Sequence, residues 1–69
     1  MKNAEDIWAQ YGSDADWERY DTFEYEVACN ITLDVDGYRF YGDGSIVCGE
    51  KEINELWCTT PEGVEIKII

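Results

Sequence analysis

Histidine is absent from this chain of 69 residues, which also has one Pro, three Cys and only five basic residues. Without His, the most common general base near neutral pH is missing, and zinc sites that combine Cys with His are excluded. The cysteines Cys29, Cys48 and Cys58 are odd in number and form no C-x-x-C pair, so neither a zinc site nor a disulfide framework is expected. We expect three buried, reduced thiols in a cytoplasmic protein.

Long hydrophobic runs are also missing. No segment approaches the roughly 18 consecutive apolar residues of a membrane-spanning helix. The first residues, MKNAEDIWAQ, lack the apolar stretch of a signal peptide. We therefore expect no contact with a membrane.

Catalytic motifs are absent as well, because the chain has no nucleophile elbow, no glycine-rich dinucleotide pattern and no phosphate-binding loop. A chain this short has little volume for a cleft of about 300 Å³ or more. The segment DGSIVCGE (43–50) matches the second half of an EF-hand loop, but Arg39 and Tyr41 fall where oxygen ligands are required. The sequence predicts no enzyme, no metal site and no cofactor, and it predicts a turn between strands at 42–45 (GDGS).

The excess of acids is the outlying feature of the composition. The chain has 16 Asp and Glu against five Lys and Arg, for a formal net charge of −11, whereas a magnitude of about 2–8 keeps a small domain soluble. Self-repulsion at this level destabilises the compact state. The charge argues against direct binding to nucleic acid or to anionic membranes, and it favours a basic protein surface as partner.

The amino-terminal residues have the signals of a short helix. Asn3 can cap it, and Glu5 and Asp6 lie in the first turn, where the helix dipole favours acids. Gly12 can end it in a left-handed conformation. The pattern predicts a helix over 4–11.

The next segment, SDADWERYD, has weaker helical signals. Ser13 and Asp16 resemble a capping box, and Trp17 and Tyr20 are three residues apart. A second helical turn over 14–20 and a structured loop are both compatible with this pattern.

A period of two begins at Phe23, in FEYEVACNITLDVDG. The odd positions from Phe23 to Val35 are apolar, which predicts a strand whose odd side chains face the core. Asp36-Gly37 is a strong signal for a two-residue hairpin turn. The turn predicts three cross-strand pairs: Val35 with Tyr38, Asp34 with Arg39, and Leu33 with Phe40.

Shorter strands are expected after the turn at 42–45. IVCG reads as a short buried strand and EKE as a charged connection. Pro61-Glu62-Gly63 then indicates a bulged loop that pairs Thr60 with Val64, Cys58 with Ile66, and Leu56 with Ile68. Trp57 would lie beside Lys67 on the outer face. The predicted fold is α+β in one domain, 1–69, with a short helix or two helical turns before an antiparallel meander of four to five strands.

Acids recur every two or three residues in SDADWERYDTFEYE, and they interleave with aromatic residues. On a strand, alternate residues lie about 6.6–6.8 Å apart on one face, a repeat of nucleic-acid-like scale. A charge run is usually a solvated face, but this charge exceeds what solubility requires, and aromatic residues dominate interface hot spots. The candidate partner-binding residues are Asp14, Asp16, Glu18, Asp21, Glu24 and Glu26, with Trp17 or Trp57 as an exposed anchor.

Small size, strong negative charge, reduced cysteines and the lack of catalytic motifs make the chain resemble the small acidic inhibitors of phages and other mobile elements. The closest class is the anti-CRISPR and anti-restriction proteins that mimic DNA. The likeness rests on composition and on the acid row, and no family motif assigns functional residues. It implies a protein of the bacterial cytoplasm that occludes a basic nucleic-acid channel in a CRISPR effector or a restriction enzyme.

Two other functions fit the same residues. An immunity-type inhibitor of a toxin or nuclease would use the acids to plug an active site. A structural or assembly module would add the apolar last strand, VEIKII, to a partner sheet or to a second copy.

Overall fold

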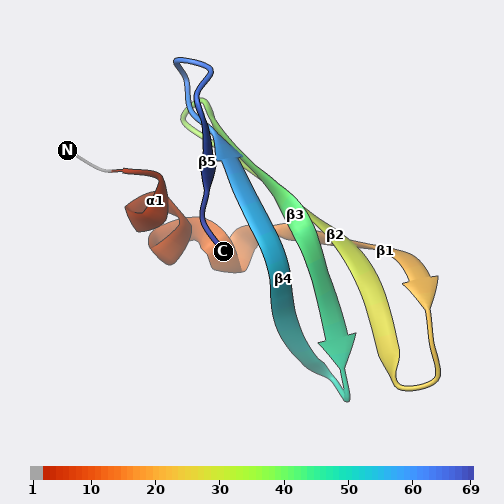
Figure 1. Cartoon of the computed structure of the whole chain (residues 1–69). Coiled ribbons are helices and arrows are strands. Elements are labelled where there is room, and N and C mark those ends of the chain that lie inside the picture. Colours follow the sequence, from red (N-terminus) through yellow and green to blue (C-terminus); the bar gives the residue numbers. More distant parts are fainter. Residues whose placement is uncertain (1–2) are drawn as a thin grey trace.

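The computed structural model describes residues 3–69 as a short helical segment followed by one five-stranded antiparallel sheet (Figure 1). The strands lie side by side in chain order, as a meander. The predicted α+β class and strand number are confirmed. The elements are α1 (Ala4–Tyr11), η1 (Gly12–Asp14, a 3-10 helix), β1 (Asp16–Thr22), β2 (Glu26–Val35), β3 (Tyr38–Val47), β4 (Glu50–Thr59) and β5 (Glu65–Lys67).

The helix α1 begins where the capping signal predicts. The backbone N–H of Asp6 donates to Asn3 Oδ1 at 2.9 Å, which satisfies one of the amide groups that a helix start leaves free. The helix predicted over 4–11 is confirmed. Gly12, however, has a φ of −58° and leads into η1, so it is not a left-handed stop. Its missing side chain provides space, because a Cβ there would lie 2.9 Å from the Trp8 indole.

The second helical turn predicted over 14–20 is wrong. Most of this segment is β1, an edge strand that pairs antiparallel with β2. Trp17 points toward the core side of the sheet, where its ring meets Gly44 and Ile31. This packing outweighs the helical spacing of Trp17 and Tyr20, and a shift in register leaves Tyr20 in a bulge.

β2 begins at Glu26 and not at Phe23. Phe23 and Tyr25 lie in the connection from β1 to β2 and are 55% and 73% exposed, so the core positions predicted for them are wrong. The chain reverses here, and the Phe23 N–H donates to the Glu26 carbonyl at 2.7 Å. From Val27 to Val35 the odd positions face the core as predicted.

β2 and β3 form the hairpin predicted from Asp36-Gly37. Both turn residues have positive φ, 48° and 83°, as a two-residue turn of this kind requires. Asp34 and Arg39 form an ion pair at 3.2 Å. The three predicted pairs are present: Val35 with Tyr38, Asp34 with Arg39, and Leu33 with Phe40.

The turn predicted at 42–45 is wrong, because β3 runs through these residues. The glycines provide space here and do not reverse the chain. A Cβ on Gly42 would overlap the carbonyl oxygen of Glu55 in the neighbouring strand, and a Cβ on Gly44 would overlap the Trp17 indole. Both contacts involve residues distant in sequence, which local turn chemistry does not reveal.

The turn between β3 and β4 is Cys48-Gly49, where φ is 53° and 83°. The residues predicted as a separate short strand and a charged connection therefore end β3 and begin β4. Cys48 is exposed, which corrects the prediction of three buried thiols, whereas Cys29 and Cys58 are fully buried. All three cysteines are free thiols.

The last hairpin follows the predicted register. Two of its three predicted pairs are hydrogen-bonded. The Thr60 N–H donates to the Val64 carbonyl at 2.9 Å, and the Ile68 N–H donates to the Leu56 carbonyl at 2.8 Å. In the third pair, Cys58 lies opposite Ile66 in the strand register. Trp57 lies opposite Lys67, whose Nζ is 5.9 Å from the centre of the indole ring. Trp57 and Lys67 therefore lie side by side as predicted, in a cation–π arrangement.

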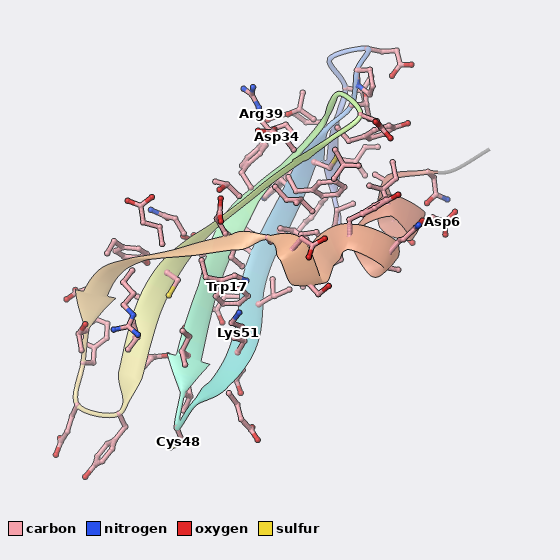
Figure 2. The ribbon with its side chains drawn as sticks, turned by 180° about the vertical axis from the view of Figure 1, so that it is seen from behind. Asp6, Trp17, Asp34, Arg39, Cys48 and Lys51 are labelled. Atoms are coloured by element: carbon pink, nitrogen blue, oxygen red, sulfur yellow. The ribbon has the colours of Figure 1, made fainter. Side chains whose placement is uncertain are left out.

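One face of the sheet, called the inner face, carries the core. α1 and the chain that leads into β1 lie on this face, behind the sheet in Figure 1 and in front of it in Figure 2. Trp17 extends the cover beyond the helix, and Lys51 Nζ lies 5.3 Å from its ring centre. The buried residues of the main cluster are Ala4, Ile7, Ile31, Phe40, Leu56 and Cys58.

The opposite face, called the outer face, is open in the part of the chain that the structure describes (Figure 1). The molecule is elongated, with extents of 42 × 19 × 16 Å. No helix within residues 3–69 has the length and apolar character needed to span a bilayer.

Replacing Gly42 tests the close approach of β3 and β4. Gly42→Ala should lower the free energy of unfolding by about 3 kcal/mol, because the added Cβ meets backbone atoms that have little room to move. Gly63→Asn is the control, since a Cβ there meets nothing within 4 Å and Asn tolerates positive φ. Its cost should stay below about 1 kcal/mol. Urea denaturation followed by circular dichroism measures both, and equal costs would contradict the strand register.

Candidate binding surface on the outer face

The outer face collects most of the acidic side chains. Directly opposed residues of antiparallel strands project to the same face, as do alternate residues of one strand, so the register assigns each side chain. Of the basic residues, Arg39 and Lys67 lie on this face, and Arg19 and Lys51 lie on the inner face. The acids on the outer face are Asp16, Glu18, Asp21, Glu26, Asp34, Asp43, Glu50, Glu52, Glu55 and Glu65.

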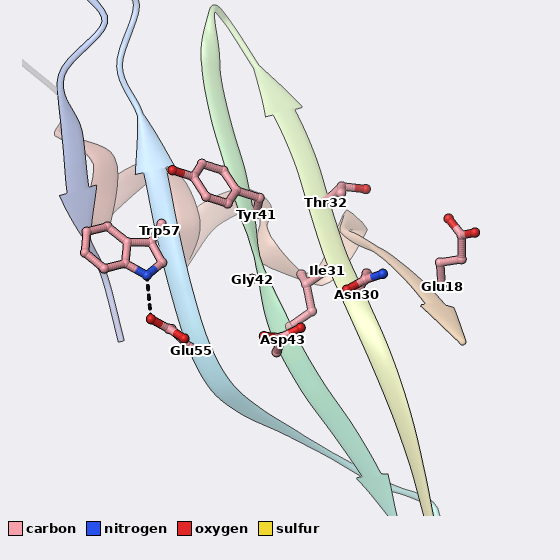
Figure 3. Close-up of a pocket in the computed structure, with 9 residues that line it drawn as sticks. All are labelled: Glu18, Asn30, Ile31, Thr32, Tyr41, Gly42, Asp43, Glu55 and Trp57. Atoms are coloured by element: carbon pink, nitrogen blue, oxygen red, sulfur yellow. Dashed lines mark hydrogen bonds between the residues drawn. The ribbon is translucent and has the colours of Figure 1, made fainter. Parts of the chain in front are cut away.

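A shallow groove of about 480 Å³ lies across β1 to β4 on this face (Figure 3), so the expectation that so short a chain lacks room for a cleft of this size is wrong. Two rows of side chains line it, each running across the strands. The first row consists of Glu18, Asn30, Asp43 and Glu55, and the second of Thr32, Tyr41 and Trp57. Because neighbouring strands are about 4.7–4.9 Å apart, each row places its members at roughly that separation.

Asp43 and Glu55 are direct cross-strand partners, so the register places two acidic residues opposite each other in the groove. Like charges in this position destabilise a sheet. Asp34, by contrast, lies opposite Arg39 and forms an ion pair with it. No grouping of three or more Cys, Asp or Glu within residues 3–69 could hold a metal ion. Within residues 3–69 no basic side chain forms an ion pair with Asp43 or Glu55, and the Glu55 carboxylate instead accepts a hydrogen bond from Trp57.

Trp57 and Tyr41 are held in place by carboxylates. Trp57 Nε1–H donates to Glu55 Oε1 at 2.7 Å, and the Tyr41 hydroxyl donates to Glu65. The bond to Glu65 raises the pKa of the Tyr41 hydroxyl above its ordinary value, because loss of the proton would leave two anions in contact. Oriented rings beside carboxylates are suited to a cationic group, which cation–π contact and ion pairing then bind together.

The connection between β1 and β2 forms a second acidic and aromatic feature, at the end of the sheet that lies away from α1 (Figure 1). Phe23 and Tyr25 of this connection, and Tyr20 near the end of β1, are all more than half exposed. Glu24 and Asp21 lie among them and are also exposed. Exposed aromatic clusters on monomeric proteins mark interaction sites more often than chance.

The structure divides the residues predicted to bind a partner. Asp14 lies in η1 and Glu24 in the connection between β1 and β2. Trp17 belongs to the inner face and packs against the core, so it is not an exposed anchor. The predicted residues that share the outer face are Asp16, Glu18, Asp21, Glu26 and Trp57.

Sequence reasoning missed most of the groove. Asn30 and Thr32 were even positions of the predicted strand, and their outward direction was available from the alternation. Tyr41 and Asp43 were missed because the turn predicted at Gly-Asp-Gly cut β3 short. Glu55 lies in β4, two residues before Trp57, so alternation from Trp57 would have placed it on the same face. Extending the predicted register past Arg39 by alternate residues would have placed Tyr41 and Asp43 beside Thr32 and Asn30.

Removing one carboxylate of the opposed pair should stabilise the free protein. We expect Asp43→Asn to raise the free energy of unfolding by about 0.5 kcal/mol at low salt, and less at high salt, because it removes a repulsion that salt screens. Asp34→Asn is the matched control, since it removes an attraction to Arg39. Thermal melts at two salt concentrations compare the variants. Destabilisation by Asp43→Asn would show that the pair is not repulsive.

The Tyr41 hydroxyl provides a pH test of the groove. Its raised pKa means that the hydrogen bond to Glu65 is complete below pH about 10, the ordinary tyrosine value, and is lost as the pH rises through the higher folded value. The absorbance titration of the wild type minus that of Tyr41→Phe isolates the Tyr41 hydroxyl. Its midpoint should lie at a higher pH than that of free tyrosine. Glu65→Gln should lower it, and an unchanged titration in this variant would contradict the assigned bond.

The chain was compared with known proteins at three levels. No protein-family model matches it, and no curated protein and no solved structure is significantly similar to it. Function is therefore inferred from the surface of this chain alone.

Proposed function

We propose that the protein binds, through its outer face, a basic protein groove that otherwise holds nucleic acid, as in a CRISPR effector or a restriction enzyme. One observation carries the proposal: the acids gather on the open face of the sheet, where Asp43 and Glu55 oppose each other. Such repulsion lowers the stability of the free protein. Lys or Arg side chains of a partner would relieve it, so the charge favours the bound state.

The arrangement of the acids supports a nucleic-acid-like role. Along a strand, the backbone positions of alternate acids such as Asp16 and Glu18 are about 6.6–6.8 Å apart, and neighbouring strands are about 4.7–4.9 Å apart. A basic groove that neutralises the closely spaced phosphates of DNA meets charges of the same sign and similar density on this face. Trp57 and Tyr41 add oriented rings, against which a guanidinium group can stack.

A second candidate, an inhibitor that plugs an active site, is favoured by the connection between β1 and β2. This segment narrows to a tip with Phe23 and Tyr25 exposed and Glu24 between them. A tip of this kind enters a cavity more readily than the flat outer face does. Inhibition of turnover with DNA binding intact would identify a plug, whereas loss of DNA binding would identify occlusion of the groove.

The proposal is tested by capture and competition. The immobilised protein is used to capture partners from a bacterial lysate at low and high salt, and each captured nucleic-acid-binding protein is purified. Guide-loaded CRISPR effectors and restriction enzymes are tested in parallel. We expect an equimolar amount of the protein to abolish DNA binding by its target in a gel-shift assay, with an affinity that falls steeply as salt rises.

Two sets of substitutions distinguish the effect of the groove carboxylates on binding from the effect of the protein's net charge. The groove variant, Glu18→Gln with Asp43→Asn and Glu55→Gln, should weaken binding by about 10- to 100-fold. The control variant, Glu5→Gln with Asp36→Asn and Glu62→Gln, removes the same charge away from the groove and should bind nearly as the wild type does. Equal losses in both variants, or binding that is insensitive to salt, would contradict the proposed surface.

Charge reversal at the tip distinguishes the two candidate functions further. Glu24→Lys with Glu26→Lys should weaken a groove binder moderately, because Glu26 lies on the outer face. Phe23→Ala with Tyr25→Ala should leave a groove binder nearly unchanged and should disable a plug. Phe23 and Tyr25 are exposed, so this second variant is expected to fold.

A further inference from the structure

β5 ends the sheet with an edge that faces no other strand within residues 3–69. Three apolar side chains around this edge are exposed: Val64 at 55%, Ile66 at 36% and Ile69 at 47%. A free strand edge is a template for pairing with another chain. The proposed nucleic-acid-like surface lies on the outer face and leaves this edge without a role.

The hydrogen bonds of β5 show which backbone groups are available at its edge. Alternate residues of a strand direct their N–H and C=O groups to opposite edges. The Val64 carbonyl accepts from Thr60 and the Ile68 N–H donates to Leu56, so the even-numbered residues pair inward with β4. The backbone groups of Glu65 and Lys67 are consequently directed to the free edge.

A second copy of the chain fits this edge in one register. When two β5 strands pair antiparallel around a two-fold axis at Ile66, Glu65 of each copy lies opposite Lys67 of the other. These are the residues whose backbone groups are available, so each pair exchanges two hydrogen bonds. Their opposite charges meet on the outer face, and the two Ile66 side chains meet on the inner face at the more closely spaced position.

The other free edge of the sheet does not suit a second copy. β1 carries Asp16, Glu18 and Asp21, and a bulge at Tyr20 interrupts its ladder. Two β1 edges would bring acids of the same sign together, and a bulge prevents regular pairing. The two edges therefore differ in charge complementarity, and β5 is the self-complementary one.

The geometry points to a homodimer formed by β5–β5 pairing, in which one sheet continues through both copies. The two-fold axis at Ile66 keeps both outer faces on the same side, so the acidic surface becomes about twice as wide across the strands. Because β5 has only three residues, the interface is small and the dimer is expected to be concentration-dependent. This inference does not depend on the proposed function.

Sedimentation equilibrium over a wide range of protein concentration tests the dimer. The average mass of the wild type should rise from that of one chain toward that of two. Lys67→Glu places two Glu side chains opposite each other at both pairs and should raise the dimer dissociation constant about tenfold or more. Lys51→Glu is the matched control, because it makes the same charge change and also removes a lysine from a Trp ring.

A charge exchange completes the test. Glu65→Lys with Lys67→Glu restores opposite charges across the two-fold axis and should dimerise again, although it loses the bond to Tyr41 and the contact with Trp57 within each copy. Circular dichroism checks that each variant is folded. A wild type that stays monomeric at every concentration would overturn the proposal, and so would a dimer that Lys67→Glu leaves unchanged.

Discussion

The rest of the structure depends on one constraint, which is that a helix of eight residues covers only one face of a five-stranded sheet. The core is therefore one-sided, and Trp17 has to extend the cover beyond the end of α1. Its indole lies directly against Gly44, where a side chain would overlap the ring. A one-sided core leaves the whole outer face to water, and this is where the chain places most of its acids.

Such a small core makes surface charge energetically significant. The core of a domain this small rarely supplies more than roughly 3–5 kcal/mol of net stability, so a repulsion of a few tenths of a kcal/mol per pair is a measurable fraction of it. A smaller net charge than −11 would be enough to keep the protein soluble. The directly opposed Asp43 and Glu55 add to this charge without a basic partner of their own. The proposed binding to a basic surface would use this charge together with the two oriented rings.

The parts of the fold that follow from local chemistry were predictable. Asp36-Gly37 and Pro61-Glu62-Gly63 each determine a turn by their own backbone preferences, and the register on both sides followed. Gly42 and Gly44 were not predictable in this way, because a glycine serves a turn and a close contact equally well. Only Glu55 and Trp17, both distant in sequence, decide between the two. For the same reason the candidate surface was found on β1 and missed on β3.

The exposed turn Cys48-Gly49 gives the protein a single accessible thiol, because Cys29 and Cys58 are fully enclosed and burial raises the pKa of the Cys58 thiol. Cys48 lies at the tip of the β3–β4 hairpin, away from α1 (Figure 2). A fluorophore or a spin label attached there would mark one end of an elongated molecule 42 Å long without altering any other part of the chain. The native sequence thus contains its own reference point for measuring how the molecule is oriented in a complex.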